Sequence, residues 1–544
     1  MRSPRKLAVL AVILLPIVAG GFLLQARAAR EGALLLDQVL SLVADRFVDS
    51  LPQGALYEKA ARGLVRELND PYTELMSPRE VKQFNTRTGG RYGGLGMSIE
   101  LREGSIVVAR VFPNTPAERN GVRERDRIIQ VDTMSTRGWS TQQASDVLTG
   151  TPGTVVRVKF NRPGVPQPLD FEITRAIVHV PAVPFSIAFG LVGYVPLQSF
   201  NENAASDVEA AIRGLQSRGA KGIVLDLRGN PGGILEQSLS VSNLFLKPGL
   251  EILSVRARSG DNQNHVARGQ PTLPVIPMIV LTDEGSASAS EIVAGALQDH
   301  DRAVIVGQTT FGKGLVQSVY SLDGGYALKL TTAKWYTPSG RSIQRERKFV
   351  DGRFVEESTR DTLETEASKK NRPTFKSDAG RVVYGGGGIT PDVIVPDDTI
   401  SSADQQLARL LAPRQEFYTL LLDYALELSK KAQPDFQPLP EWRQEGRARA
   451  EAKGLRLDAK QWEGGSAWLD RQLEHWVARY ATGDSAAMRR EVAIDAPLRK
   501  ALDMMSKGQN QKDLFGIAQA SSKPLNGALA PKTQNAAARP EQRP

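Results

Sequence analysis

The part of the chain that most constrains the fold lies between about Val192 and Pro396, where short apolar runs alternate with helical segments. Three of these runs predict buried strands, at residues 222–227, 275–281 and 303–306. Strands that alternate with helices in this way are typical of a layered α/β core. A charged, glycine-containing stretch at 345–387 interrupts the pattern and is interpreted as a surface loop or flap.

The flanking regions have different patterns, so the chain is predicted to be a multidomain α+β protein. Residues 31–85 show helical spacing and a turn at 69–72, residues 89–177 contain short β-branched strands, and 401–516 is helical. The last residues have few large apolar side chains, which indicates a disordered tail. The predicted parts are 1–28, 31–85, 89–177, 185–398, 401–516 and 519–544.

The N-terminus has the features of an export signal. Arg2, Arg5 and Lys6 precede an apolar stretch at 7–24, and residues 26–28 (Ala-Arg-Ala) are typical of a cleavage site. The stretch also reaches the lower length of a spanning helix, so a cleaved signal and a retained anchor both remain open, and we favour the anchor. In either case we expect the rest of the chain in the periplasm, free or facing it from the inner membrane.

Composition excludes several classes of function. The chain has no cysteine, so thiol nucleophiles, disulfides and cysteine zinc sites are excluded. The net charge of +9 is spread among acidic residues, without a basic run that would indicate a nucleic-acid partner. No HExxH or similar ligand pattern occurs, and we expect no metal and no cofactor.

The segment 282–291, TDEGSASASE, is the strongest candidate for catalysis. It follows a predicted strand and opens a helix, so Ser288 lies where unpaired N–H groups and the helix dipole favour a developing oxyanion. Ser288-x-x-Glu291 is also a capping box, in which Ser288 would only cap the helix. Both interpretations stay open on this segment alone.

A second segment, 310–317, offers a general base. Lys313 lies between two glycines and four residues before Gln317, a spacing that puts both side chains on one face of a strand. A lysine acts as a base only when neutral, and burial lowers the pKa of a lysine from its reference of about 10.4. An exposed lysine on a glycine turn is the alternative.

Two further features are candidates for parts of such a site. Residues 225–233, LDLRGNPGG, predict a strand followed by a glycine turn, whose amides could form one arm of an oxyanion hole or serve only the turn. Among the four histidines, His300 is the nearest rival base, and its neighbours instead indicate a solvated helix end.

Together these segments resemble the C-terminal processing peptidases, or tail-specific proteases, over roughly residues 35–396. The motifs occur in the family's order: DPYT at 70–73, YGGLGM at 92–97, DLRGNPGG at 226–233, GSASASE at 285–291, FGKGLVQ at 311–317, YTPSGRSIQ at 336–344 and GITPD at 388–392.

The resemblance implies a serine endopeptidase with a Ser–Lys–Gln arrangement. It assigns Ser288 as nucleophile, Lys313 as base and Gln317 as its partner, with the amides of Gly233 and Ala289 as the oxyanion hole. A non-catalytic exported scaffold on a degenerate protease fold is the alternative, and a transacylase or CoA-binding enzyme is disfavoured because no phosphate cradle is present.

Residues 89–177 resemble a PDZ module, which binds a peptide as an added strand and holds its carboxylate with loop amides. The resemblance implies a loop of Gly93, Gly94, Leu95 and Gly96 and an edge strand from Met97 through Ile99 to Leu101. The expected partners are therefore proteins or peptides with free C-termini. A homo-oligomer or an adaptor binding through 401–516 also stays open.

The chain departs from the family pattern at three places. Arg125 stands where the family usually has glycine, and Thr133 occupies a turn that often carries glycine. The insertion 345–387 separates the SIQ motif from GITPD. The first two departures affect turn shapes, and the third affects access to the site.

Overall fold

The structure is a computed structural model that describes residues 30–521, apart from 103, 274–275, 351–352, 357–371, 397–400, 412–413, 434–435 and 456. The predicted signal at 1–28 and most of the predicted tail lie outside the described residues. The chain divides into two compact units. One contains the residues up to Val81 with Gln317–Thr331, and the other contains Lys82–Val316 and the chain from Thr332 onward.

The first unit combines N-terminal helices with part of a hairpin. Helix residues 30–46 and α2 (Gln53–Glu67) precede a turn in which Asp70 accepts hydrogen bonds from Tyr72 N and Thr73 Oγ1. Strand β1 (Glu74–Met76) then pairs with residues 327–329 of β18 (Ala327–Tyr336). This strand was not predicted, because three residues are too few to show a period. Helix α3 (Pro78–Gly89) follows and crosses into the second unit.

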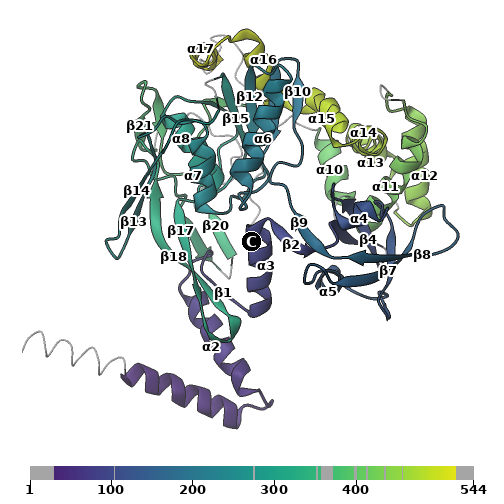
Figure 1. The fold of residues 1–544 in the computed structure, drawn as a ribbon, viewed down its shortest axis with the longest axis horizontal. Helices are drawn as coiled ribbons and strands as arrows, with labels where there is room; N and C mark the ends of the chain where they lie inside the picture. The colour runs from purple at the N-terminus through teal and green to yellow at the C-terminus, as the bar shows by residue number, and fades with distance from the viewer. Residues whose placement is uncertain are drawn as a thin grey trace, which may run out of the picture. The chain divides into compact units, whose positions relative to one another are not determined.

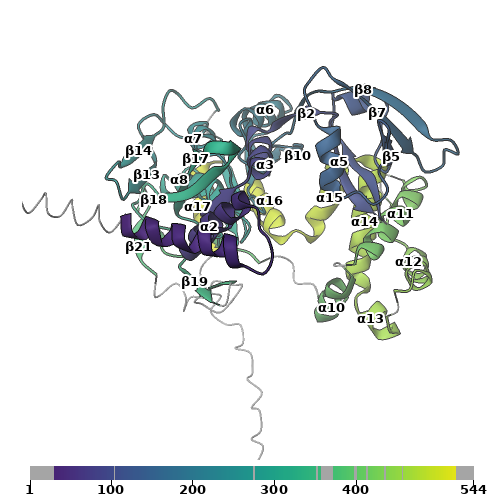
Figure 2. The same cartoon turned by 90° about the horizontal axis from the view of Figure 1, so that it is seen from below.

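The PDZ module, in the second unit, is built on a six-stranded antiparallel sheet (Figure 2). Its order is β3 (Met97–Arg102), β4 (Ser105–Val111), β5 (Arg127–Val131), β7 (Val155–Asn161) and β8 (Leu169–Thr174), with β6 (Met134–Ser135) on β5. Helices α4 (Pro116–Arg119) and α5 (Thr141–Leu148) cover a core that includes Ile106, Val158 and Phe160. Strand β2 (Arg91–Gly94) pairs separately with β9 (Ala176–His179).

The unusual turn residues of this module adopt conformations that glycine adopts easily. Arg125 has φ 72°, and the following Asp126 is fully buried, accepting from Arg123 N and from the Arg162 guanidinium. In the other turn it is Asp132, with φ 50°, that takes the positive φ, in place of Thr133. The substitutions therefore keep the turns and add local strain.

The protease core is built on a six-stranded sheet ordered β10-β11-β12-β15-β16-β23 (Figure 1). The strands are Ile187–Phe189, Val192–Pro196, Gly222–Asp226, Met278–Thr282, Val304–Gly307 and Val393–Ile394, and only β10 is antiparallel to its neighbour. All residues of β12, β15 and β16 are buried. Strands this apolar require cover on both faces of the sheet.

Helices from distant parts of the chain provide that cover. One face packs against α6 (Ala204–Ser217), α7 (Leu235–Asn243) and α8 (Ala289–Asp299). The other face, which includes Val224, Leu281 and Val306, packs against Leu498, Met504 and Leu514 of α16 (Ala496–Lys507) and α17 (Gln511–Ser521). The C-terminal helices therefore complete the protease core. Because α17 reaches Ser521, the predicted tail also begins later than residue 519.

A second sheet contains β13 (Glu251–Ala257), β14 (Gln263–Val266), β17 (Leu315–Ser321) and β18, with the short 3₁₀ turn η1 (Asp323–Gly325) between the last two. Strand β13 pairs with residues 333–336 of β18. These strands lead the chain away from and back to the loop that carries Lys313.

The insertion is more ordered than the predicted surface loop. Its described parts form two hairpins, β19 (Arg347–Val350) with β20 (Arg353–Glu356), and β21 (Thr374–Lys376) with β22 (Val382–Tyr384). In the second hairpin Ser377 and Val383 are buried against the core. The loop prediction was wrong there, because charged residues such as Arg381 make ion pairs with the core in place of contacts with solvent.

The remaining C-terminal region is helical, as α10 (Ser402–Leu411), α11 (Gln415–Ser429), α12 (Pro440–Ala452), α13 (Ala459–Gly464), α14 (Ser466–Thr482), α15 (Asp484–Glu491) and η2 (Val492–Ile494). Among the described residues no helix has the length and apolar character needed to span a membrane. These elements confirm the predicted multidomain α+β fold class.

Candidate active site

The predicted catalytic segments meet at one edge of the core sheet. The loops after β12, β15 and β16 carry Gly233, Ser288 and Lys313 respectively, and β12, β15 and β16 are adjacent parallel strands. The carboxyl ends of parallel strands lie at the same edge, which is where α/β proteins commonly place their sites. Hydrogen bonds from Gly229 N to Asp283 Oδ1 (2.8 Å) and from Phe311 N to Ser286 O (3.0 Å) join the three loops.

The backbone of Ser288 distinguishes it from an ordinary helix cap. Ser288 precedes α8 with φ 55° and ψ −110°, whereas a cap residue normally has an extended conformation. Ser140, which caps α5 through the same type of capping box, has φ −77° and ψ 159°. A positive φ at a residue other than glycine stores strain and is concentrated at functional sites. Capping alone therefore does not account for Ser288.

The three serines of the motif have different environments. Ser286 and Ser290 are fully buried, and their hydroxyls donate to Leu227 O (2.8 Å) and Asn230 O (2.9 Å) of the β12 loop. Ser288 between them is only half-buried. The outer serines therefore tether the glycine loop, and the middle hydroxyl is the one accessible to a substrate.

A buried carboxylate joins the loops of the two predicted catalytic residues. Glu291 Oε2 accepts from Ser288 N (2.8 Å) and Lys313 N (2.9 Å), while Oε1 accepts from Gly312 N and Thr310 Oγ1 (both 2.6 Å). Since both amides bond one oxygen, their nitrogens lie within about 6 Å of each other. Full burial raises the pKa of Glu291, and its four hydrogen bonds act in the opposite direction.

Two more side chains fix the backbone around Lys313, whose own side chain is half-buried. Trp335 Nε1 donates to Lys313 O at 3.1 Å, and Gly314 N donates to Gln344 Oε1 at 2.8 Å. The lysine is thus carried by a loop whose amides and carbonyl are held from three directions. This rigidity is what a base needs in order to remain aimed at one hydroxyl.

The glycine loop lies directly against the nucleophile. A Cβ on Gly232 would lie 2.8 Å from Ala289 N and 3.0 Å from Ser288 Cβ. Phe200 N bonds Gly232 O, and Phe200 O accepts from Ile234 N, so the amide of Gly233 points away from Phe200. Ala289 begins α8, and the first N–H groups of a helix lack an intrahelical acceptor. Both amides assigned to the oxyanion hole therefore belong to this junction.

Gly232→Ala should lower kcat/KM by about 100-fold or more, because the new Cβ would displace the backbone beside Ser288. Gly232 also has φ 94°, which disfavours any side chain. Gly229→Ala is the matched control, since Gly229 has φ 65° in the same loop but open space around its Cβ. Steady-state cleavage of a peptide would measure both, and equal effects would show that strain alone explains them.

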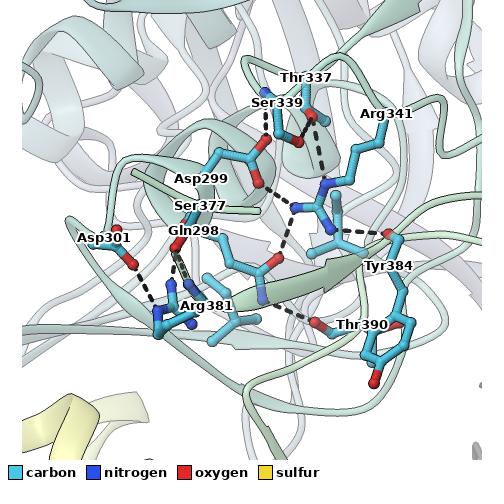
Figure 3. A network of polar contacts seen from close by, with 12 residues as sticks. Gln298, Asp299, Asp301, Thr337, Ser339, Arg341, Ser377, Arg381, Tyr384 and Thr390 are labelled. Carbon is cyan, nitrogen blue, oxygen red and sulfur yellow. Dashed lines mark hydrogen bonds and ion pairs between the residues drawn. The ribbon is translucent and has the colours of Figure 1, made fainter. Parts of the chain in front are cut away.

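The far end of α8 is anchored by a polar network (Figure 3). The fully buried Arg341 donates to Asp299 Oδ1 (2.7 Å) and Gln298 Oε1 (2.8 Å). Ser339 N donates to Asp299 Oδ2 at 3.0 Å, and Arg381 Nε donates to Asp301 Oδ1 at 2.6 Å. The network joins the helix that carries Ser288 to the segment that leads to Gln344.

The structure contradicts the prediction of a solvated His300. Its side chain is only 7% exposed, with Nδ1 2.8 Å from Asp378 Oδ2 and Nε2 2.6 Å from Glu251 O. No local pattern indicated Asp378 as a partner, because it lies 78 residues away. His300 follows the last residue of the 11-residue α8, so it lies about 16 Å along the axis from Ser288. It is a structural residue outside the site.

Gln317 lies on β17 in the other compact unit, where its Nε2 is 3.4 Å from Thr331 Oγ1 of β18. Its partnership with Lys313 stays a prediction. Within the described residues, no group of three or more His, Asp or Glu side chains is arranged to hold a metal ion.

The PDZ module has a groove beside β3, which is an edge strand of its sheet. A cavity of about 160 Å³ there is lined by Tyr92, Leu95, Met97, Ile99 and, from α5, Ser145 and Leu148. The predicted glycine loop is shorter than expected, because Gly93 and Gly94 belong to β2 and pair with Ile177 and Ala176 of β9. Their glycine identity did not reveal a strand.

Tyr92 lies at the amides that follow that strand. The backbone N–H groups of Gly96 and Met97 donate to its hydroxyl, while burial raises the pKa of Tyr92 to about 12. Its ring lies against Gly94, where a Cβ would be 2.5 Å from Tyr92 Cε2. A substrate carboxylate would therefore meet the Tyr92 hydroxyl at these two amides.

Comparison with known proteins identifies the family. Peptidase family S41 matches residues 191–350, and the PDZ domain matches residues 83–160. A carboxy-terminal-processing protease of Bartonella bacilliformis is 44% identical over 297 residues, which are 53% of this chain and 67% of the relative. The chain belongs to peptidase family S41. It is a serine-type, C-terminal processing protease with a PDZ domain.

Other S41 relatives give the same picture. The carboxy-terminal processing protease CtpA of Bacillus subtilis is 36% identical over 290 residues, covering 53% of this chain and 62% of that protein. The solved photosystem II D1 C-terminal processing protease is 29% identical, with a TM-score of 0.33, over 59% of this chain and 91% of that one.

Sequence reasoning missed the positioning roles of Glu291, Trp335 and Gln344. Glu291 stood out only as half of a capping box, and Gln344 only as part of a family motif. Their contacts with the Lys313 loop span 14 to 30 residues of the chain and follow no local period.

Proposed function

We propose that this S41 protease cuts protein substrates as an endopeptidase through an acyl-enzyme formed on Ser288, with Lys313 as general base. The observation that carries the proposal is the bridging Glu291 carboxylate, which bonds the backbone of both residues. The strained conformation and partial exposure of Ser288 support it.

In the first step the neutral Lys313 amine accepts the Ser288 hydroxyl proton while Oγ forms a bond to the scissile carbonyl carbon. The amides of Gly233 and Ala289 would donate to the resulting oxyanion. The Lys313 ammonium then gives its proton to the leaving amine as the C–N bond breaks. Water attacks the acyl-enzyme with Lys313 again as base, which releases the acid and restores Ser288.

Gln317 is proposed to orient the Lys313 amine without adding charge. An amide partner keeps the neutral amine accessible, whereas a carboxylate would favour the ammonium form. Its place four residues after Lys313, at the third position of β17, supports this role.

Recognition of substrate C-termini is assigned to the PDZ groove. A peptide added to the free edge of β3 would place its last side chain in the apolar cavity beside Met97 and Ile99, and its carboxylate at the amides of Gly96 and Met97. Peptides with a free, apolar C-terminus should therefore bind at least about 10-fold more tightly than their C-terminal amides. Fluorescence anisotropy with the full chain would measure both, and equal affinities would contradict this assignment.

We also propose that the chain is exported, with residues 7–24 as an anchor or cleaved signal. The basic residues before this apolar stretch support the orientation. Externally added protease should digest the chain in spheroplasts but not in intact cells. Full protection in spheroplasts would contradict export.

A further inference from the structure

The loop that carries Gly232 and Gly233 is held by a charged cluster at its start. Arg228 Nε and Nη2 donate to the two oxygens of Asp226, at distances from 2.7 to 3.1 Å. Tyr194 OH donates to Asp226 Oδ2 at 2.7 Å. The Arg228 side chain is 18% exposed and that of Asp226 is 7% exposed, so this pair is largely removed from water.

The cluster has a fourth member from a distant part of the chain. Arg228 Nη1 and Nη2 donate to Asp495 Oδ1 (2.8 Å) and Oδ2 (2.7 Å), a two-bond pairing across 267 residues. Asp495 is 14% exposed. Such a paired arrangement fixes orientation as well as distance, because the guanidinium and carboxylate are both planar.

Asp495 also begins the helix that seals the core. It caps α16, with Oδ1 accepting from Leu498 N at 2.9 Å, and α16 and α17 pack on the sheet through Leu498, Met504 and Leu514 (Figure 1). The same carboxylate therefore joins the C-terminal helices to Arg228, the residue just before Gly229.

The charges in the cluster show why Asp495 matters to Arg228. Burial disfavours the guanidinium charge, but the Asp226 and Asp495 carboxylates outweigh this and raise the pKa of Arg228. With both carboxylates present, the guanidinium is held from two sides. Without Asp495, it would be held only by its near neighbour Asp226, and the loop beyond it would have one anchor fewer.

We propose that Asp495 is a positioning residue for the oxyanion hole, so that the C-terminal segment 495–521 is a working part of the protease site. This inference rests on the proposed acyl-enzyme function. Asp495 does not touch the substrate. It acts through Arg228 on the five glycine-rich residues that end at Gly233.

The test uses Asp495→Asn in the full chain, because asparagine caps a helix as well as aspartate does but carries no charge. Asp458→Asn is the matched control, since Asp458 caps α13 from an exposed position, accepting from Gln461 N at 2.7 Å. Asp495→Glu tests whether restoring the charge restores activity. All variants are assayed well below the unfolding temperature, with kcat divided by the folded fraction from circular dichroism.

We expect Asp495→Asn to lower kcat about 10-fold or more with little change in KM, and to weaken a peptide boronate by a similar factor. A boronate forms a tetrahedral adduct whose oxygen occupies the oxyanion hole, so it reports the hole directly. Asp458→Asn should match the wild type, and Asp495→Glu should recover part of the loss.

Wild-type kcat and boronate affinity in Asp495→Asn, or a change in KM alone, would overturn the inference. If Asp495→Asn folds poorly, the same ratios measured on Asp495→Glu decide it, since the longer side chain keeps the charge but shifts the pairing. Wild-type protein in the same assay keeps the two claims apart: without cleavage there, the proposed function itself fails.

Discussion

Ser288→Ala should lower kcat/KM for an unfolded protein such as casein by at least about 10⁴-fold, because the chain loses the only atom that can form the acyl-enzyme. The fold should survive, since Ser288 is half-buried and alanine has no larger side chain to accommodate. Casein cleavage and thermal unfolding, measured on the same preparation, would check both parts.

Ser290→Ala is the control for that variant. It removes a hydroxyl of the same motif that is fully buried and donates to Asn230 O, so it should reduce stability by about 1–3 kcal/mol and leave most of the activity. Wild-type turnover by Ser288→Ala would end the assignment of the nucleophile.

Lys313→Arg should be as inactive as Lys313→Ala, with losses of about 10³-fold or more in kcat/KM, because an arginine stays protonated and cannot accept the serine proton. In the wild type, activity should rise with pH through neutrality, since only the neutral amine is a base. Rate–pH profiles of the three proteins would measure this.

Two controls separate the loss of a lysine base from a loss of stability or the action of a histidine base. Lys334→Arg makes the same change at an exposed position of β18 and should keep wild-type activity. His300→Ala removes contacts with Asp378 and Glu251 and should reduce stability but keep most of the activity below the unfolding temperature. An inactive His300→Ala together with an active Lys313→Ala would contradict the mechanism.

The sequence predicts the elements of this fold well where a period or a motif is long enough to recognise. The buried runs at 222–227 and 303–306 are strands of the core sheet, and the edge strand predicted from Met97 is β3. Elements with little local pattern were missed. Strand β1 has three residues, and the hairpin β21–β22 lies in a charged stretch whose charges are neutralised by the core.

The candidate site shows the same division. Ser288, Lys313 and Gly233 were assigned from motifs, while local pattern alone could not separate a helix cap from a nucleophile at Ser288. The φ of 55° does separate them, and a backbone angle cannot be read from side-chain identities. Asp495 could not be linked to Arg228 from sequence at all, because a contact across 267 residues depends on how α16 packs on the sheet.

The most direct test of the Ser–Lys mechanism is to trap the nucleophile with a fluorophosphonate, which phosphonylates a serine only when its hydroxyl is activated. After digestion, mass spectrometry should locate the adduct on Ser288 in the wild type, with labelling strongly reduced in Lys313→Ala and absent in Ser288→Ala. Labelling at another serine, or none in a wild-type chain that is folded, would contradict the mechanism and favour a non-catalytic scaffold.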